Sequence, residues 1–298
     1  MAILVVAALL PLVSPLDWLH LLVKIMIMGL FASSLNLLLA YTGMVCFGGA
    51  AFFGVGAYTG ALLVLKTSVP FPLAFMAAPV VAALCGLIIG WFCVRLSDIF
   101  FAMLTLAFGE LIFAIIFKWY SFTGGDNGLV NIPLPSLLEP IQTYYYFVLV
   151  IVIVCLTVFW ILSNSPFGKT LQAIRDNAER VEFIGVNVRR YKLIVFVIFS
   201  FFAGISGVLF AFFNHNVFPV YAGWVKGAEP LLMIILGGTY NFLGPTAGAA
   251  IFLILEKVIF ARTEYWPICM GVVLACCVLF LRGGLLGFLQ SKLRKGSQ

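Results

Sequence analysis

The sequence predicts an all-α polytopic membrane protein of about 8–10 transmembrane helices, with Gly-rich broken or re-entrant segments. Hydrophobic residues make up 64% of the 298 residues and charged residues only 9%, against about 25% charged in a soluble domain. Apolar runs near 20 residues recur along the chain, and a helix of about that length crosses roughly 30 Å of hydrocarbon. These runs exceed the strands of membrane barrels. Soluble enzymes, nucleic-acid-binding modules and secreted disulfide domains are thereby excluded.

The apolar runs define the expected spans in chain order. The run from Met1 to about Val13 lacks the basic start and the cleavage site of a signal peptide, so we expect a retained short first helix. In the Gly-interrupted region after residue 229, either Pro230–Gly238 is itself a short crossing of the membrane or one segment is broken and re-entrant. The further expected spans are Trp18–Tyr41, Phe47–Leu65, Phe71–Val94, Ile99–Phe117, Tyr144–Leu162, Leu193–Phe213, the Gly-interrupted Pro230–Phe260, and Tyr265–Leu281.

Basic residues predict the orientation. The interval Asn164–Lys192 contains six of the seventeen Lys and Arg residues, and further basic residues occur in the tail 282–298. Because positively charged loops stay in the cytoplasm, both segments and the N-terminus are predicted to be cytoplasmic. The segment Lys118–Thr143 then lies outside, and Lys226 and Glu229 are assigned to the outer loops.

Two segments, Gly43–Gly60 and Gly237–Ala250, are dense in glycine. Unwound backbone at membrane depth is tolerated only where it is buried in protein or lines a cavity. Interrupted segments in the two halves of a chain therefore indicate a substrate path. The alternative explanation of the glycines is close helix packing, and both explanations can hold at once. The G-x-x-x-G pairs that favour packing are Gly56/Gly60, Gly86/Gly90 and Gly244/Gly248.

Polar residues within the spans are the other candidates for a path. Glu110 lies near the middle of a span, where a charge is costly and is expected to face a cavity or a partner. We expect a pathway or packing-network role for it, whereas snorkelling at helix ends explains Lys24 and Lys257. The candidate translocation-path residues are Asn36, Tyr41, Gly43, Cys46, Gly49, Thr105, Glu110, Gly237, Gly238 and Asn241.

The cytoplasmic interval contains an amphipathic pattern. Apolar residues recur at three- and four-residue steps from Leu171 to Ile184, and Gly185 is a plausible helix stop. We expect a short helix whose apolar face has no obvious partner within the chain. It lies on lipid headgroups or docks against a separate cytoplasmic subunit, and three acids among the six bases favour a protein. The candidate coupling residues are Gly168, Lys169, Ala173, Arg175, Asp176, Asn177, Glu179, Arg180 and Gly185.

No nucleotide or metal site is predicted. Gly168-Lys169-Thr170 resembles the end of a phosphate loop, but Ser163 stands where that motif needs glycine. We therefore expect a non-enzymatic chain that holds no cofactor, with any ATP handled by a partner. The seven cysteines form no C-x-x-C pair and there are only two histidines, so buried cysteines that pack as small hydrophobes are expected.

The predicted outer loop contains a run of turn-forming residues. Glycine, aspartate and asparagine at this density are typical of a turn. A role at the outer mouth, or in contact with an extracytoplasmic partner, is the functional alternative. The residues are Thr123, Gly124, Gly125, Asp126, Asn127 and Gly128.

Four blocks, taken together and in this order, resemble the permease subunits of branched-chain amino acid ABC importers, specifically the M-type (LivM-like) half. They are Asn36–Gly43 with Gly54–Tyr58, Phe101–Phe108 with Thr123–Gly128, Ser165–Lys169 with Ala173–Asn177, and Leu236–Thr239 with Gly244–Pro245. The resemblance implies a single permease domain over 1–298 in the bacterial cytoplasmic membrane. Its loop at about 164–192 would contain the helix that couples to an ATPase.

The resemblance also implies partners: an H-type permease in a heterodimer, two cytoplasmic ATP-binding subunits that hold ATP and Mg²⁺, an extracytoplasmic substrate-binding protein, and membrane lipid, but no nucleic acid. The family tends to show Gln, Ser and His where this chain has Met44, Cys46 and Gly49. Branched-chain or related hydrophobic amino acids are the expected substrates, and other amino acids, urea-like amides or aromatic acids stay open. The alternative function is an ion-coupled secondary transporter that uses Glu110.

Overall fold

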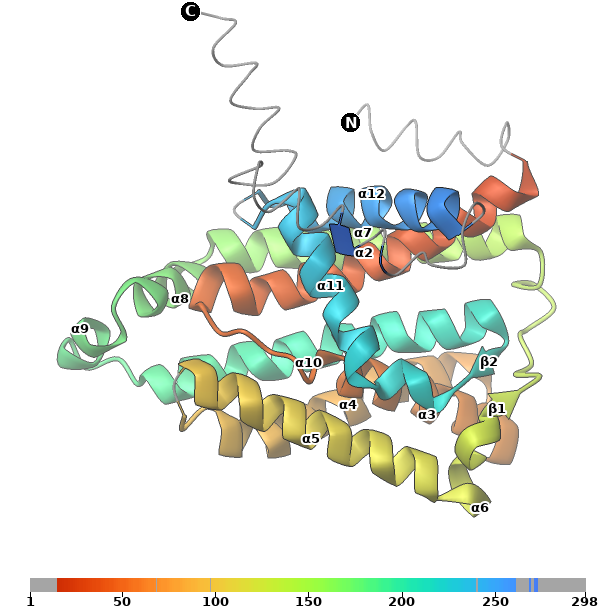
Figure 1. The fold of residues 1–298 in the computed structure, drawn as a ribbon, viewed down its shortest axis with the longest axis horizontal. Helices are drawn as coiled ribbons and strands as arrows, with labels where there is room; N and C mark the ends of the chain where they lie inside the picture. The colour runs from red at the N-terminus through yellow and green to blue at the C-terminus, as the bar shows by residue number, and fades with distance from the viewer. Residues whose placement is uncertain are drawn as a thin grey trace, which may run out of the picture.

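The computed structural model describes residues 15–67, 69–96, 98–239, 241–260, 268 and 271–272. The expected first helix, the tail and nearly all of Tyr265–Leu281 lie outside the described residues. Within them, six helices are long and apolar enough to cross a membrane (Figure 1). These are α2 (Leu16–Thr42), α3 (Gly49–Thr67), α4 (Phe71–Cys93), α5 (Asp98–Lys118), α7 (Ile141–Asn164) and α10 (Val188–Asn214). The predicted spans before Pro230 that lie in this part of the chain are confirmed, with ends that differ by a few residues.

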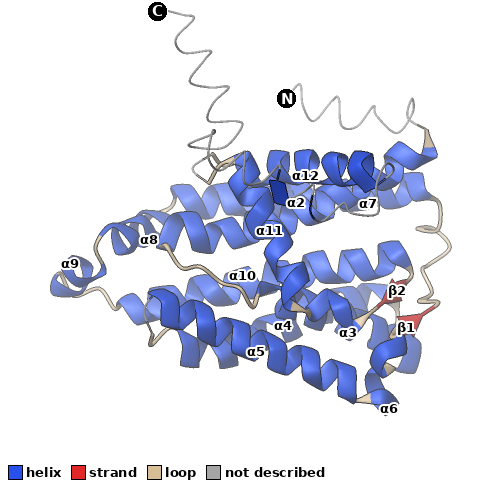
Figure 2. Ribbon diagram, viewed as in Figure 1, coloured by secondary structure: helices blue, strands red, loops and turns tan. Residues whose placement is uncertain are grey.

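Shorter elements connect these helices (Figure 2). Two short strands pair antiparallel, with Leu129 opposite Val217, and join the loop after α5 to the end of α10. The shorter elements are α6 (Tyr120–Thr123), η1 (Gly125–Asn127), β1 (Leu129–Val130), α8 (Pro166–Asp176), α9 (Ala178–Phe183), β2 (Asn216–Val217), η2 (Pro219–Ala222), α11 (Trp224–Gly237) and α12 (Gly244–Phe260).

The helices form two layers, which meet where α2 packs on α10 (Figure 1). In one layer α2 packs on α7 and α12; in the other α10 packs on α3 and α4. Aromatic rings fill the core, and the Phe52 and Phe196 rings meet edge to face with 5.4 Å between centroids. Such an arrangement stabilises a packed pair beyond its buried area.

Glycines let the helices of the second layer approach closely. A Cβ on Gly56 of α3 would lie 2.5 Å from the Cα of Gly204 in α10, and one on Gly86 would overlap Ser200. The G-x-x-x-G pairs at 56/60 and 86/90 therefore mediate helix packing, as the packing interpretation predicts.

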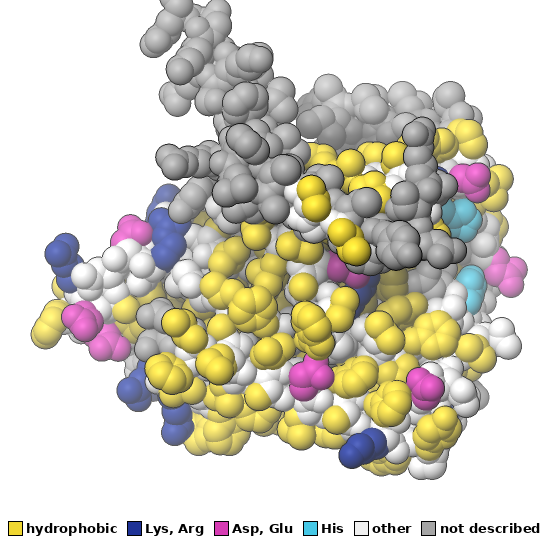
Figure 3. Space-filling model, in the orientation of Figure 1, with side chains coloured by type: hydrophobic (Ala, Val, Ile, Leu, Met, Phe, Trp, Pro, Cys, Tyr) yellow, Lys and Arg dark blue, Asp and Glu magenta, His cyan; other side chains and the backbone are white. Residues whose placement is uncertain are grey.

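The molecule has two polar ends and an apolar middle (Figure 3). The α8/α9 end is rich in basic side chains, whereas acidic side chains and histidines lie at the β1/β2 end. Large apolar side chains are exposed between the ends, with Ile88 on α4 at 63% and Val150 on α7 at 60%. An apolar exposed band of this kind suits a hydrocarbon surrounding.

Both Gly-rich segments are broken. α2 ends at Thr42, and the next residue, Gly43, has a φ of +73°. An irregular stretch that includes the buried Cys46 then leads to the start of α3 at Gly49. The region Pro230–Phe260 divides into α11 and α12, and the described residues between them, 238–239 and 241–243, are not helical and are called the α11–α12 turn. Pro230–Gly237 thus forms the second half of α11, which begins at Trp224.

Candidate functional site

The amphipathic interval forms two helices rather than one. Ser165 caps α8 by accepting a hydrogen bond from the Gly168 backbone N–H at 3.3 Å. Asn177 has extended backbone, and its Oδ1 accepts from the Arg180 N–H at 2.9 Å, which starts α9. The prediction of one helix across this interval is wrong because the Asn177 side chain replaces a helical hydrogen bond as a cap.

The apolar face of this interval packs within the chain, so the prediction that it lacks a partner is wrong. Leu171 and Ile174 are buried, and Ile174 forms a cluster with Val181 and Val188. α8 also crosses the end of α7 closely enough that Gly168 has no room for a Cβ. What stays exposed is the tip, where Phe183 is 89% exposed.

Arg175 connects α8 to α2. Its Nη1 donates to the Ala40 carbonyl oxygen at 2.5 Å, and its Nη2 lies 3.1 Å from Asp176 Oδ1. Its Cγ lies 3.3 Å from where a Cβ on Gly43 would be, so the arginine stem runs beside the break after α2. A charged donor to a backbone carbonyl is among the stronger hydrogen bonds in proteins.

A cavity of about 70 Å³ lies beside this arginine. Asn36 is 5% exposed there, and its Nδ2 donates to the Thr239 carbonyl at 3.2 Å. Its Oδ1 is buried and has no hydrogen-bond partner among the residues that the structure describes. The cavity therefore joins α8, the last turns of α2 and the α11–α12 turn. Its lining residues are Asn36, Ala40, Tyr41, Gln172, Arg175, Thr239, Asn241 and Phe242.

Three further path candidates lie at the first break. Cys46, Gly49 and Thr105 are buried, and the backbone of Thr105 in α5 leaves no room for a Cβ on Gly48. At the second break, Gly237 packs directly against Gly244. Parts of both breaks thus pack against other protein backbone, which is the setting that irregular backbone at membrane depth requires.

Glu110 lies apart from the cavity. Its Oε1 accepts a hydrogen bond at 3.1 Å from the backbone N–H of Trp224, the first residue of α11. A carboxylate at a helix N-terminus satisfies a free N–H and interacts favourably with the helix dipole. The carboxylate thus joins α5 to the start of α11.

Two ion pairs differ from the sequence predictions. Lys226 and Glu229 lie inside α11 with 2.6 Å between Nζ and Oε2, so their assignment to an outer loop is wrong. Lys24 Nζ lies 3.3 Å from Glu256 Oε2, so the charge of Lys24 is paired within the protein rather than snorkelled. The mean hydropathy of a span-length segment does not reveal a single charged residue within it. The sequence also does not show which helix will pack beside that residue.

The turn predicted at Thr123–Gly128 is present. The Thr123 hydroxyl donates to the Ile116 carbonyl at 2.6 Å, and Gly124 and Gly128 have φ of +80° and +64°. Asp126 and Asn127 are exposed. The loop therefore presents two polar side chains at the β1/β2 end.

The predicted coupling and path residues meet at only one place. Arg175 of the coupling set lines the cavity with the path candidates Asn36, Tyr41 and Asn241. Gln172 and Thr239 were missed, because only the tertiary fold brings α8 to the α11–α12 turn. The other exposed coupling candidates lie on α8, on α9 and in the residues that flank α9, and none of them lines this cavity: Lys169, Ala173, Asp176, Asn177, Glu179, Arg180 and Gly185.

Comparison with known proteins adds the following. Residues 18–281 match the family model described as branched-chain amino acid transport system / permease component. The chain is 27% identical to the high-affinity branched-chain amino acid transport system permease protein LivM of Escherichia coli (strain K12), over 88% of this chain and 69% of that protein. It is 25% identical to LivM of Salmonella typhimurium, over 99% of this chain and 76% of that protein. LivH of Escherichia coli (strain K12) is 26% identical over 49% of this chain and 47% of its own length. No solved structure matches significantly.

Proposed function

The chain belongs to the branched-chain amino acid transport permease family, and we propose that it is the transmembrane subunit of an ATP-binding cassette importer. Its substrates are branched-chain or related hydrophobic amino acids. The similarity to both LivM and LivH supports a second, H-type permease as its partner in the membrane. Two ATP-binding subunits and an extracytoplasmic binding protein complete the proposed assembly. ATP and Mg²⁺ bind to the ATPases, and this chain catalyses no reaction.

The hydrogen bond from Arg175 to Ala40 is the observation that supports this function most strongly. A motor outside the membrane needs a rigid connection to a span, and Arg175 joins α8 to the last turns of α2. Asn36, one helical turn earlier on α2, joins that helix to the α11–α12 turn. Displacement of α8 therefore acts on both broken segments through two named contacts.

Alternating access follows from this connection. Closure of the ATPases on ATP moves α8, and α8 pulls on the end of α2. The breaks at 43–48 and 238–243 change conformation most easily, because irregular backbone lacks the hydrogen-bond ladder of a helix. Substrate selectivity is supplied mainly by the binding protein.

The proposed orientation places the α8/α9 end in the cytoplasm of a bacterium, with the chain spanning the inner membrane several times. The bias of basic residues towards that end supports this orientation. The loop Thr123–Gly128 then meets the binding protein outside. The basic residues at the α8/α9 end are Arg95, Lys169, Arg175, Arg180, Arg189, Arg190 and Lys192.

An ion-coupled transporter needs a carboxylate that exchanges a proton or ion during transport. Glu110 instead caps α11, where its charge is favoured by the Trp224 N–H. This contact supports the packing-network role of Glu110 over the ion site.

Purification of the tagged chain from its native membrane tests the proposal. We expect a complex that contains a second permease and two ATP-binding subunits per pair of permeases, identified by mass spectrometry and native mass. A chain that purifies alone, from membranes that take up leucine in a manner that needs this chain, contradicts the proposal.

A further inference from the structure

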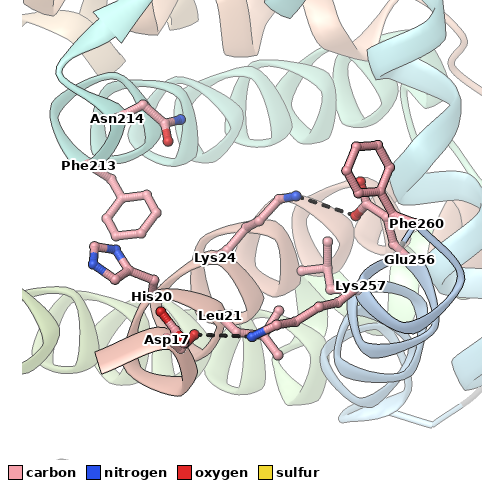
Figure 4. A pocket seen from close by; sticks show the side chains of 10 residues that line it. Asp17, His20, Leu21, Lys24, Phe213, Asn214, Glu256, Lys257 and Phe260 are labelled. Atoms are coloured by element: carbon pink, nitrogen blue, oxygen red, sulfur yellow. Dashed lines mark hydrogen bonds and ion pairs between the residues drawn. The ribbon is translucent and has the colours of Figure 1, made fainter. Parts of the chain in front are cut away.

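A groove of about 490 Å³ opens between α2, α12 and the end of α10 (Figure 4). Each of the two long walls is one helix face, because its four residues follow the spacing i, i+3, i+4, i+7. Phe213 and Asn214 of α10 form the third side. The wall residues are Asp17, His20, Leu21 and Lys24 on α2, and Leu253, Glu256, Lys257 and Phe260 on α12.

Charges of both signs lie in the groove. Lys24 and Glu256 form the inner pair at 3.3 Å, with side chains 33% and 26% exposed. Nearer the start of α2, Lys257 Nζ lies 3.4 Å from the backbone carbonyl of Asp17 and 5.1 Å from the Trp18 ring centroid. Two acids and two bases balance, so neither an anion nor a cation is favoured overall.

Apolar side chains accompany these charges. Leu21, Leu253, Phe213 and Phe260 line the groove beside the inner ion pair. The volume lies within the range of about 300–1,000 Å³ for small-molecule sites, which combine apolar walls with a few fixed polar groups. The groove therefore suits a ligand that has one positive and one negative group at one end and an apolar remainder.

We propose that this groove binds a hydrophobic α-amino acid as a zwitterion. The substrate carboxylate pairs with Lys24 and Lys257, its ammonium pairs with Glu256, and its side chain lies on Leu253 and Phe213. The proposal rests on the proposed function for the class of ligand. It adds a place where the permease itself holds substrate, at the end of the molecule opposite α8.

A zwitterionic phospholipid headgroup offers the same pair of charges. Anionic lipids favour clusters of basic residues, and here acids match the bases. Phosphatidylethanolamine is thus the competing source of the same chemistry, and the experiment separates it from free amino acid.

Radiolabelled leucine binding to the purified full-length chain in phosphatidylcholine nanodiscs is the test. We expect saturable binding that weakens at least tenfold in the double variant Lys24→Met/Glu256→Gln. Loss of both partners leaves no unpaired buried charge, so this variant keeps its fold, which an unchanged thermal unfolding temperature verifies. Lys66→Met is the matched control: Lys66 lies at the same end, donates to the Ser121 carbonyl at 2.8 Å and is outside the groove.

Competition with analogues tests the zwitterion. Isoamylamine lacks the carboxylate and 4-methylpentanoate lacks the ammonium, so neither displaces leucine at a hundredfold excess. Leucine binding that is unchanged in the double variant overturns the proposal, and so does displacement of leucine when phosphatidylethanolamine replaces phosphatidylcholine. The proposed function fails separately: a chain that binds leucine in the groove but assembles with no ATPase refutes only the function. ATP-driven uptake with wild-type leucine binding in the double variant refutes only the groove.

Discussion

Arg175 of α8 donates a hydrogen bond to the Ala40 carbonyl at 2.5 Å, across 135 residues of sequence. α8 is amphipathic and lies at the basic end of the molecule, whereas Ala40 is in the last turn of the buried α2. This contact connects a polar surface helix directly to the membrane-spanning core, beside the apolar packing of α8 on α2 and α7.

Removal of this connection is expected to uncouple ATP hydrolysis from transport. Arg175→Met keeps the aliphatic stem but loses a charged hydrogen bond of about 1.5–3 kcal/mol. We expect leucine uptake per ATP hydrolysed to fall about tenfold while the complex still assembles. Arg189→Met serves as the control, because Arg189 is an exposed basic residue at the start of α10 and lies outside the candidate coupling set. Equal coupling ratios in the two variants contradict the account.

Asn36 is expected to matter for transport more than for stability. Asn36→Leu loses the bond to Thr239 but also removes the buried Oδ1, which no described residue hydrogen-bonds. These two effects on the free energy of unfolding oppose each other. We expect a change in melting temperature of a few degrees at most and a several-fold loss of uptake.

Ser33→Ala is the matched control for Asn36, because in the described part of the chain the Ser33 hydroxyl bonds within its own helix, to the Gly29 carbonyl at 2.7 Å. Uptake at the wild-type rate is expected from it. If Asn36→Leu also transports at that rate, Asn36 has no part in the transmission of movement.

Glycine packing predicts opposite effects at two helical glycines. Gly56→Ala brings a Cβ to 2.5 Å from the Gly204 Cα and is expected to destabilise by about 1–3 kcal/mol. Gly29→Ala meets Thr246 at an ordinary 3.4 Å and is expected to be neutral or stabilising by up to about 1 kcal/mol. Thermal unfolding in detergent measures both, and a reversed order would contradict the packing of α3 on α10.

Glu110 distinguishes a helix cap from an ion site. Glu110→Gln keeps an oxygen that accepts the Trp224 N–H but removes the charge, so we expect uptake within about twofold of wild type and an unchanged pH dependence. Glu110→Leu removes the acceptor and is expected to lower the melting temperature. Loss of proton or ion dependence in Glu110→Gln supports the ion-coupled alternative instead.

Much of the fold follows from the sequence, because apolar length alone defines spans such as α4 and α10. The polar pairings do not. The sequence places Lys226 and Glu229 in a loop, whereas the structure places them in α11. Lys24 pairs with Glu256, which is 232 residues later in the chain. The apolar periodicity continues through Asn177, but the helix breaks there because the Asn177 side chain accepts the Arg180 N–H and starts a new helix. Gln172 and Thr239 face one cavity only because α8 folds back onto α2.

Reconstitution into proteoliposomes tests the central claim most directly. Leucine uptake is measured for this chain with its paired permease, binding protein and ATP, with and without the two ATP-binding subunits. The account predicts uptake only when the ATPases are present and hydrolyse ATP. Concentrative uptake by the permeases without them, driven by an ion gradient, contradicts it.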